Sequence, residues 1–287
     1  METIVTRTKG KRCVIGDKHP LAIIGEKINP TGKKKLAEEL LSGDCSRVRQ
    51  YALSQAEAGA RIIDINVGVA GIEEEKILPQ AIRAAMETVD LPLSIDSTNP
   101  EAIQAALKVY EGRAIVNSVT GEEKSLEALL PIVKKYNAAV IGLTFDEDGL
   151  TNDPYKRLKV AQKILKKAQK YGIAEEDVLI DCLARPVSME KDTAKFALQT
   201  IQLVREELRV NTVLGISNVS FGLPERKFLN AAFLALAIAK GLTCAIIDPT
   251  ITAMKKIVLA INLLSGYDEF AAKWIEFYRT NKFPLNK

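Results

Sequence analysis

Eight short apolar runs, each ending in polar or small residues, alternate along this chain with longer segments of helical spacing. Each run is rich in Ile, Val and Leu, which is typical of strands buried on both faces. The runs cover residues 21–29, 61–68, 91–98, 113–121, 138–146, 177–184, 212–220 and 244–250. Helices are predicted over 47–58, 74–89, 100–110, 125–136, 155–171, 189–208, 226–240 and 251–264. This alternation predicts an α/β chain folded as a (β/α)8 barrel, or TIM barrel.

The alternation runs without a linker, so we expect a single domain over residues 1–287, with the barrel in 21–265. An open, doubly wound sheet is the alternative, but it would need a Gly-rich loop after an early strand, and no GxGxxG motif is present. Residues 1–20 predict a β-hairpin around Lys9-Gly10, placed to plug the amino end of the barrel. Residues 266–287 predict a C-terminal helix and tail. Its aromatic face should pack against the barrel or form a dimer contact, and it comprises Phe270, Trp274 and Phe277.

Composition narrows the classes of function. The chain has 40 basic and 36 acidic residues, with only a short basic run at Lys33–Lys35, so we expect no nucleic-acid partner. No apolar run reaches about 18 residues, so we expect no membrane span, and the amino terminus lacks a signal-peptide stretch. Four widely spaced cysteines predict neither a disulfide framework nor a zinc cluster, and favour the cytoplasm. The single histidine, His19, is expected to be structural or solvated, which would exclude chemistries that need a histidine in the site.

The active site of such a barrel lies at the carboxyl ends of its strands. The predicted strand ends carry Glu26, Asn29, Asp64, Asn66, Asp96, Asn117, Thr144, Asp146, Asp181, Ser217, Asn218 and Asp248. Carboxylates and carboxamides suit a planar heterocycle that presents N–H and NH₂ groups, whereas a phosphate would attract Lys, Arg or backbone N–H groups. Two alternatives stay open. Several Asp from different strands can hold magnesium, and strand-end Asp and Asn often cap the following helix.

Six motifs resemble those of a known family. They are GEKIN (25–29), DINVG (64–68), SIDSTN (94–99), IVNSVTG (115–121), LIDCLARPVS (179–188) and GISNVSFGLPER (215–226). Together they look like the pterin-binding methyltransferases, barrel enzymes that pass a methyl group between methyltetrahydrofolate and a corrinoid. The resemblance covers roughly residues 21–265 in motif order and spacing. The wider family includes dihydropteroate synthase and the folate module of cobalamin-dependent methionine synthase.

The resemblance implies roles for individual residues. Asp96, Asn117 and Asp181 match the positions that hold the pterin edge, and Asn218 matches the position near N5. It therefore implies Asn218 and Asp96 as the catalytic candidates. The implied pterin-binding set is completed by Glu26, Asp64, Asn66, Gly215, Ser217 and Arg226.

Two matched positions, Arg226 and Phe221, lie in the last of the six motifs. Arg226 falls where a basic residue follows the loop in relatives, which implies contact with the folate tail. Phe221 stands where some relatives carry an amide, which implies a more apolar rim to the site.

The reaction implied is methyl transfer between N5 of tetrahydrofolate and the cobalt of a corrinoid. Moving a methyl from N5 needs protonation of N5 or donors aimed at it, and Asn218 could either accept a hydrogen bond there or donate one. The chain has no Asp-x-His-x-x-Gly motif for a corrinoid and no zinc-binding cysteine set for homocysteine. We therefore expect tetrahydrofolate or methyltetrahydrofolate as substrate, a corrinoid carried by a partner protein, and no metal bound by this chain.

The RPVS sequence at 185–188 favours members that transfer methyl from a methylcorrinoid protein to tetrahydrofolate in demethylation pathways, and relatives tend to be homodimers. Folate and methanopterin share the pteridine edge that Asp96, Asn117 and Asp181 would bind, so the sequence leaves both open as ligands. A non-catalytic folate-binding barrel (a sensor or docking subunit) and a magnesium-dependent lyase or aldolase are alternatives. A dihydropteroate synthase-like enzyme is a further one, although its Lys on the seventh strand and Arg-x-His on the eighth are replaced by GISN and IIDP.

Overall fold

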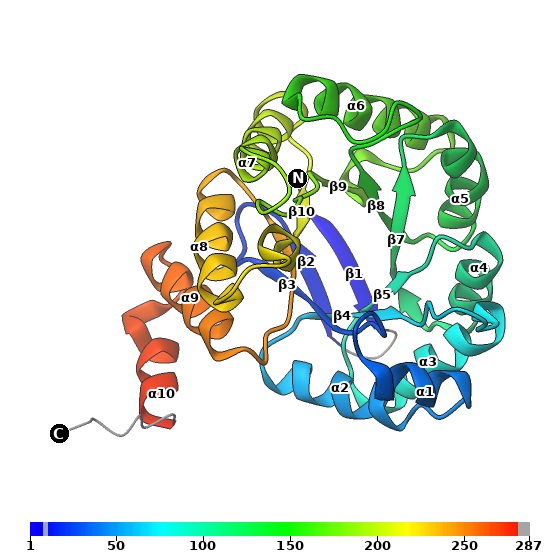
Figure 1. Cartoon of the computed structure of the whole chain (residues 1–287), viewed down its shortest axis with the longest axis horizontal. Helices are drawn as coiled ribbons and strands as arrows, with labels where there is room; N and C mark the ends of the chain where they lie inside the picture. Colours follow the sequence, from blue (N-terminus) through cyan, green and yellow to red (C-terminus); the bar gives the residue numbers. More distant parts are fainter. Residues whose placement is uncertain (8–10, 281–287) are drawn as a thin grey trace.

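The computed structural model, which describes residues 1–7 and 11–280, contains a closed barrel of parallel strands with helices around it (Figure 1). The barrel strands are β3 (Ala22–Ile28), β4 (Ile62–Asn66), β5 (Leu93–Asp96), β7 (Ile115–Thr120), β8 (Ala139–Leu143), β9 (Val178–Asp181), β10 (Thr212–Gly215) and β11 (Cys244–Ile247). They pair in the order β10-β11-β3-β4-β5-β7-β8-β9, so the pairing of β11 with β3 joins the last barrel strand to the first. The predicted (β/α)8 barrel is confirmed.

The helices that follow the strands lie outside the barrel (Figure 1). They are α2 (Ser46–Glu57), α3 (Glu74–Thr88), α4 (Pro100–Val109), α5 (Glu123–Lys135), α6 (Pro154–Lys170), α7 (Thr193–Leu203), α8 (Arg226–Ala239) and α9 (Thr252–Leu264). Two of these helices begin at a capping side chain. The side chains of Asn99 and Asp153 accept hydrogen bonds from the first backbone N–H groups of α4 and α6. An additional helix, α1 (Lys34–Leu41), was not predicted.

Two predicted elements differ from the observed ones. The strand predicted over 212–220 ends at Gly215, and a 3₁₀ turn, η3 (Ile216–Ser220), takes its place. Ile216 and Val219 are both buried, and residues three apart share a side in a 3₁₀ helix, so the apolar pattern fits this turn as well as a strand. The helix predicted over 189–208 begins only at Thr193 and ends in a π-helical turn, Val204–Leu208.

Strand residues alternate between the barrel interior and the surrounding helices, because successive side chains point to opposite faces. The interior is apolar toward the amino ends of the strands, where it comprises Ala22, Ile24, Ile62, Ile115, Ala139, Ile141, Leu179, Val213 and Cys244. The outward-facing residues pack against the helices and include Ile63, Ile65, Leu93, Ile95, Val116, Val140, Ile180 and Leu214. Each such large apolar side chain contributes about 1.5–3 kcal/mol on burial. The carboxyl ends of the same strands carry the polar residues Glu26, Asp64, Asp96, Asn117 and Asp181.

The amino end of the barrel is closed by the predicted hairpin. Strands β1 (Thr3–Arg7) and β2 (Arg12–Ile15) pair antiparallel, and Val5, Cys13 and Ile15 pack into the interior apolar cluster. The predicted turn at Lys9-Gly10 lies outside the described residues. A short strand that was not predicted, β6 (Gly112–Arg113), pairs with β1 and extends this small sheet.

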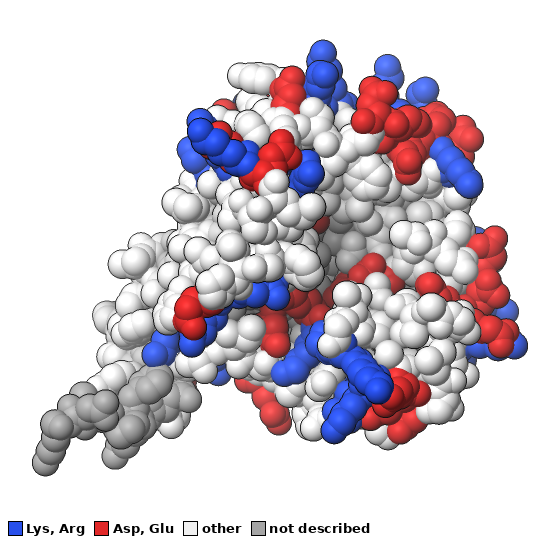
Figure 2. All heavy atoms as spheres, in the orientation of Figure 1, with Lys and Arg blue, Asp and Glu red and all other residues white. Residues whose placement is uncertain are grey.

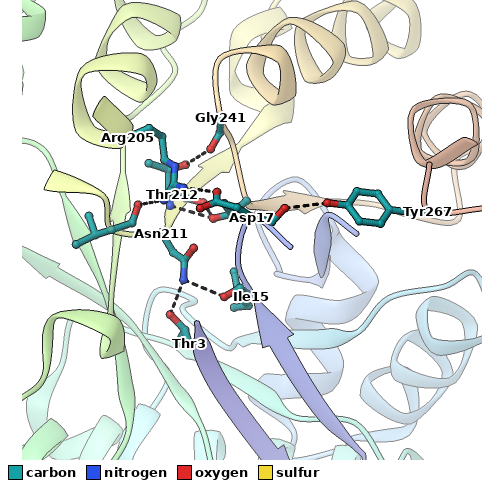
Figure 3. Close-up of polar contacts among 10 residues, drawn as sticks. Thr3, Ile15, Asp17, Arg205, Asn211, Thr212, Gly241 and Tyr267 are labelled. Carbon is teal, nitrogen blue, oxygen red and sulfur yellow. Dashed lines mark hydrogen bonds and ion pairs between the residues drawn. The ribbon is translucent and has the colours of Figure 1, made fainter. Parts of the chain in front are cut away.

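Polar contacts tie the hairpin to the amino ends of the barrel strands (Figure 3). The Nδ2 of Asn211 donates to Thr3 Oγ1 at 3.0 Å and to the Ile15 carbonyl at 2.9 Å. Asp17 forms an ion pair with Arg205, and its carbonyl accepts from Tyr267 at 2.8 Å. His19 lies in the same region and is hydrogen-bonded to Glu2 at 2.8 Å. The expectation that this histidine is structural or solvated is confirmed.

The C-terminal helix α10 (Ala272–Thr280) contacts α9 and extends away from the barrel (Figure 1). Trp274 and Phe277 are half-buried, and Lys255 of α9 lies over the Phe277 ring at 5.5 Å. The predicted packing of the aromatic face against the barrel is wrong for Phe270, which is 96% exposed. Its backbone has a φ of +54°, which breaks the helix before α10 and turns this ring away from the other two. Within the described residues, no helix has both the length and the apolar character needed to span a membrane.

Candidate functional site

The predicted strand-end residues occupy the carboxyl end of the barrel interior. Glu26, Asp64, Asn66, Asp96, Asn117 and Asp181 stand at alternate positions after interior residues of the same strands, so their side chains share the interior face. Asp64, Asn117 and Asp181 are buried. Figure 2 shows a hollow near the centre of this face, with acidic side chains in it and basic side chains beside it. Five strands therefore bring six of the predicted residues together.

Asp64, Asp96 and Asn117 form one connected group on three neighbouring strands. Asn117 Nδ2 donates to Asp64 Oδ1 at 3.2 Å, and Asp96 is the register partner of both Asn66 and Asn117. Burial raises the pKa of Asp64 well above its ordinary value, and the nearby Asp96 carboxylate raises it further. Burial also raises the pKa of Asp96, while hydrogen bonds from Asn66 and Asp64 oppose that rise. The pKa of Asp64 is therefore raised more than that of Asp96, so Asp96 is the carboxyl of this pair that more readily carries the negative charge.

Asp181 is the second buried carboxylate of the interior. Burial raises its pKa to about 7, opposed by a hydrogen bond from the backbone N–H of Leu183 and by the charge of Arg157. The Leu183 N–H donates to Asp181 Oδ1 at 2.7 Å, from a residue whose φ is +50°. The strand end and the loop after it thus hold this carboxylate in one orientation.

Arg157, which sequence reasoning missed, fixes that loop. This α6 side chain is fully buried, and its Nη1 donates to the Cys182 carbonyl at 2.8 Å and to the Leu183 carbonyl at 2.9 Å. Its Nη2 is buried without a hydrogen-bond partner in the described structure. The sequence does carry a signal for this residue. Arg157 shares a helix face with the apolar Val160, Ala161 and Ile164, and a cation on such a face is expected to be buried and hydrogen-bonded.

Glu26 lies on the side of the interior formed by β3 and β10. Ser217 Oγ donates to Glu26 Oε2 at 3.1 Å. Burial raises the pKa of Glu26 to about 7. The hydrogen bond from Ser217 lowers this pKa, and so do the charges of Lys33 and Arg226. The charge of Asp248 raises it. This carboxyl therefore exists in both its neutral and its charged form near neutral pH.

The η3 turn presents the remaining predicted residues at the mouth of the barrel. Asn218 is exposed, and its side-chain amide has no hydrogen-bond partner among the residues described. A Cβ at Gly215 would lie 3.2 Å from Asn218 Nδ2, so the glycine leaves room for this amide. Arg226 holds the turn by donating to the Ser217 carbonyl at 2.8 Å and to Ser220 Oγ at 3.1 Å. Its guanidinium also lies 5.7 Å from the centre of the Phe221 ring, which is 63% exposed at the rim.

Three strand-end residues do not join the group. Asn29, Asp146 and Asp248 each accept a hydrogen bond from a backbone N–H two residues further along their own loops, at 2.9, 3.2 and 2.9 Å. The loop-stabilising role that the sequence left open applies to these residues, and Asn66 and Asp181 also accept such a bond, from Gly68 at 2.9 Å and from Leu183 at 2.7 Å. Conversely, sequence reasoning missed Glu74, which accepts from Ser97 Oγ at 2.5 Å and whose charge raises the pKa of Asp96.

The described residues show neither a disulfide nor a group of side chains arranged for a metal ion. Cys13, Cys45, Cys182 and Cys244 are all buried with free thiols. Residues 1–7 and 11–280 contain no cluster of three or more His, Cys, Asp or Glu arranged to hold a metal ion.

Comparison with known proteins gives consistent matches. The family model described as pterin binding enzyme matches residues 25–248. The methylcorrinoid:tetrahydrofolate methyltransferase of Eubacterium limosum is 31% identical over 270 residues, covering 91% of this chain and 97% of that protein. The methionine synthase of Mycobacterium leprae is 32% identical over 247 residues, which are 80% of this chain but only 20% of that protein.

Solved structures agree on the fold. The dihydropteroate synthase of Xanthomonas albilineans in complex with 7,8-dihydropteroate superposes with a TM-score of 0.69 at 19% identity, covering 91% of this chain and 98% of that one.

Proposed function

Because the chain belongs to the pterin binding enzyme family, we propose that it is a methyltransferase that moves a methyl group between N5 of tetrahydrofolate and the cobalt of a corrinoid protein. The favoured direction is from the methylcorrinoid protein to tetrahydrofolate. The name and the near-complete coverage of the Eubacterium limosum relative support both statements. Methionine synthase, whose match is confined to a fifth of its length, supports the pairing of folate with a corrinoid.

The observation that carries the proposal is the set of acceptors inside the barrel. A pterin presents an N–H and an exocyclic NH₂ group along one edge, and two carboxylates and a carboxamide are complementary to it. We assign that edge to Asp96, Asn117 and Asp181. The directions of the two pKa shifts support this assignment, because the larger rise at Asp64 favours Asp96 as the charged acceptor. The pocket would be lined further by Glu26, Asp64, Asn66, Gly215 and Ser217.

Asn218 is assigned to N5 because its amide is exposed at the mouth and free to accept from a protonated N5 or donate to a neutral one. The corrinoid, carried by the partner protein, supplies a cobalt centre that gives or takes the methyl group. This chain would hold the pterin with N5 toward the open end of the barrel and orient it for in-line transfer. Arg226 would meet the folate tail through the part of its guanidinium that does not bond the η3 turn.

We also propose the domain organisation, the cellular location and the oligomeric state of the protein. Residues 1–287 would form a single domain, with the barrel at 21–265, the hairpin region at 1–20 and the helix and tail at 266–287. A cytoplasmic location is proposed because the four cysteines are buried and unpaired.

A homodimer is proposed because α8, α9 and the segment before α10 expose large apolar side chains, namely Phe228, Leu236, Leu264 and Phe270. Sedimentation equilibrium should give twice the mass of one chain, and the mass of a single chain would refute it.

A titration followed by a spectroscopic assay tests the proposed function. We expect the purified protein to bind methyltetrahydrofolate in a calorimetric titration, and no binding at millimolar ligand would refute the proposal. With tetrahydrofolate and a methylated corrinoid as probe, under anaerobic conditions, the corrinoid spectrum should change to that of the demethylated form. Folate binding with an unchanged spectrum would instead favour the non-catalytic folate-binding barrel.

A further inference from the structure

We propose that Glu26 is the group that exchanges a proton with N5 of the folate during methyl transfer, an inference that rests on the proposed function. The sequence resemblance placed Glu26 only among the residues that line or support the pocket. The structure distinguishes it from the other interior carboxylates by its hydrogen bonds and by its neighbours.

The contact that carries the inference joins β3 to the η3 turn. Ser217 Oγ donates to Glu26 Oε2 at 3.1 Å, and Ser217 is the residue directly before Asn218. The carboxyl of Glu26 is thereby coupled to the turn that presents Asn218 at the mouth. A proton carrier must lie within hydrogen-bond reach of the atom it serves, directly or through one water, and this placement is consistent with that requirement.

The charged groups around Glu26 leave its carboxyl free to titrate. Lys33 follows β3, Arg226 begins α8 and Asp248 follows β11, and none of these forms an ion pair with Glu26 in the described structure. The Lys33 ammonium donates to the Asn29 carbonyl at 3.0 Å, and the Arg226 guanidinium donates to the Ser217 carbonyl. Both cations are therefore held on neutral oxygens. Burial raises the pKa of Glu26 to about 7, where a carboxyl can both give and accept a proton at neutral pH.

The other interior carboxyls are already engaged. Asp64 and Asp96 interact with each other, and they are further bonded by Asn117 and Asn66, respectively. Asp181 accepts from the Leu183 N–H at 2.7 Å and lies at the end of β9, which β10 and β11 separate from β3. Asn218 has a carboxamide, which neither gains nor loses a proton near neutral pH. Glu26 is therefore the described carboxyl best placed to take part in proton transfer at N5.

The proton step balances in both directions. When N5 of tetrahydrofolate takes the methyl group, a carbon–nitrogen bond forms, the cobalt–carbon bond breaks and its electron pair stays on cobalt. N5 is then a protonated tertiary amine, and it passes its proton to the Glu26 carboxylate. In reverse, the Glu26 carboxylic acid protonates N5 of methyltetrahydrofolate, so that the methyl group leaves from an ammonium nitrogen rather than from a neutral amine.

The test compares Glu26→Gln with Glu127→Gln, a control on the exposed face of α5 that lies outside the site. The amide oxygen that Glu26→Gln introduces can still accept from Ser217, while the titratable proton and the negative charge are removed. Calorimetry of methyltetrahydrofolate binding, in two buffers of different ionisation enthalpy, measures the protons exchanged on binding without any corrinoid present. We expect wild type and the control to take up the same fraction of a proton near pH 7, and Glu26→Gln to take up less. Asp181, whose pKa is also about 7, exchanges protons equally in all three proteins.

Transfer rates give the second readout. From methyltetrahydrofolate to the corrinoid, the wild-type rate should rise as the pH falls through 7, because the acid form of Glu26 is needed. In the opposite direction it should rise as the pH rises through 7. Glu26→Gln should lose both pH dependences and slow the transfer about 10²–10⁴-fold. If Glu26→Gln does not fold, Glu26→Asp serves in its place, and a shifted pH profile is then expected.

The outcomes separate the inference from the proposed function. Glu26→Gln (or Glu26→Asp) with wild-type proton uptake and an unchanged pH profile would overturn the role of Glu26 and leave the methyltransferase proposal intact. Wild-type protein that neither binds folate nor transfers methyl would overturn both.

Discussion

Replacing Asn218 with alanine should slow methyl transfer about 10²–10³-fold and change the Kd for folate only a few-fold. The reason is that the Asn218 amide has no hydrogen-bond partner in the described protein and stands exposed on the η3 turn. It therefore contributes little to holding the pterin in the ground state, and its donor and acceptor become useful as the charge at N5 changes. Stopped-flow spectroscopy of the corrinoid measures the transfer rate, and calorimetry measures the Kd.

Asn262→Ala is the matched control, because Asn262 lies on α9 beside a cavity at the amino end of the barrel. It should leave both the rate and the Kd unchanged. Equal losses of binding and transfer in Asn218→Ala would contradict the assigned role, because they would show uniform binding rather than stabilisation of the transition state.

Replacing Asp96 with alanine should weaken folate binding about 100-fold or more. A carboxylate that accepts two hydrogen bonds from a pterin edge contributes about 1.5–3 kcal/mol for each bond. The same change also removes the charged neighbour of Asp64, which is only 3% exposed. The expected loss is therefore in Kd, and calorimetric titration with methyltetrahydrofolate measures it.

Asp90→Ala serves as the control for this variant, because Asp90 is exposed at the amino end of the strand that carries Asp96. Asp96→Asn separates charge from shape. It keeps an oxygen acceptor but loses the negative charge, so its Kd should fall between those of wild type and Asp96→Ala. A wild-type Kd in Asp96→Ala would remove this residue from the pterin edge.

Several elements could be predicted because their signals are local. The apolar runs marked the eight barrel strands, since strands buried on both faces carry Ile, Val and Leu without interruption. The caps Asn99 and Asp153 marked the starts of α4 and α6. The η3 turn was predicted as strand because Ile216 and Val219 fit both patterns, and the difference matters, since the turn carries Ser217 and Asn218 at the mouth.

The sequence by itself determined that polar residues end the strands, and the period of two along each strand determined that Glu26, Asp64, Asp96 and Asp181 share the interior face. Only the tertiary structure decided how these residues are partnered. Closing the barrel brings Asn117 to Asp64 across 53 positions and Ser217 to Glu26 across 191. It also buries Arg157 behind the loop of Asp181. A pKa depends on burial and on neighbouring charges, and both arise only when strands distant in the chain meet, so the residues that carry charge or protons could be identified only from the folded molecule.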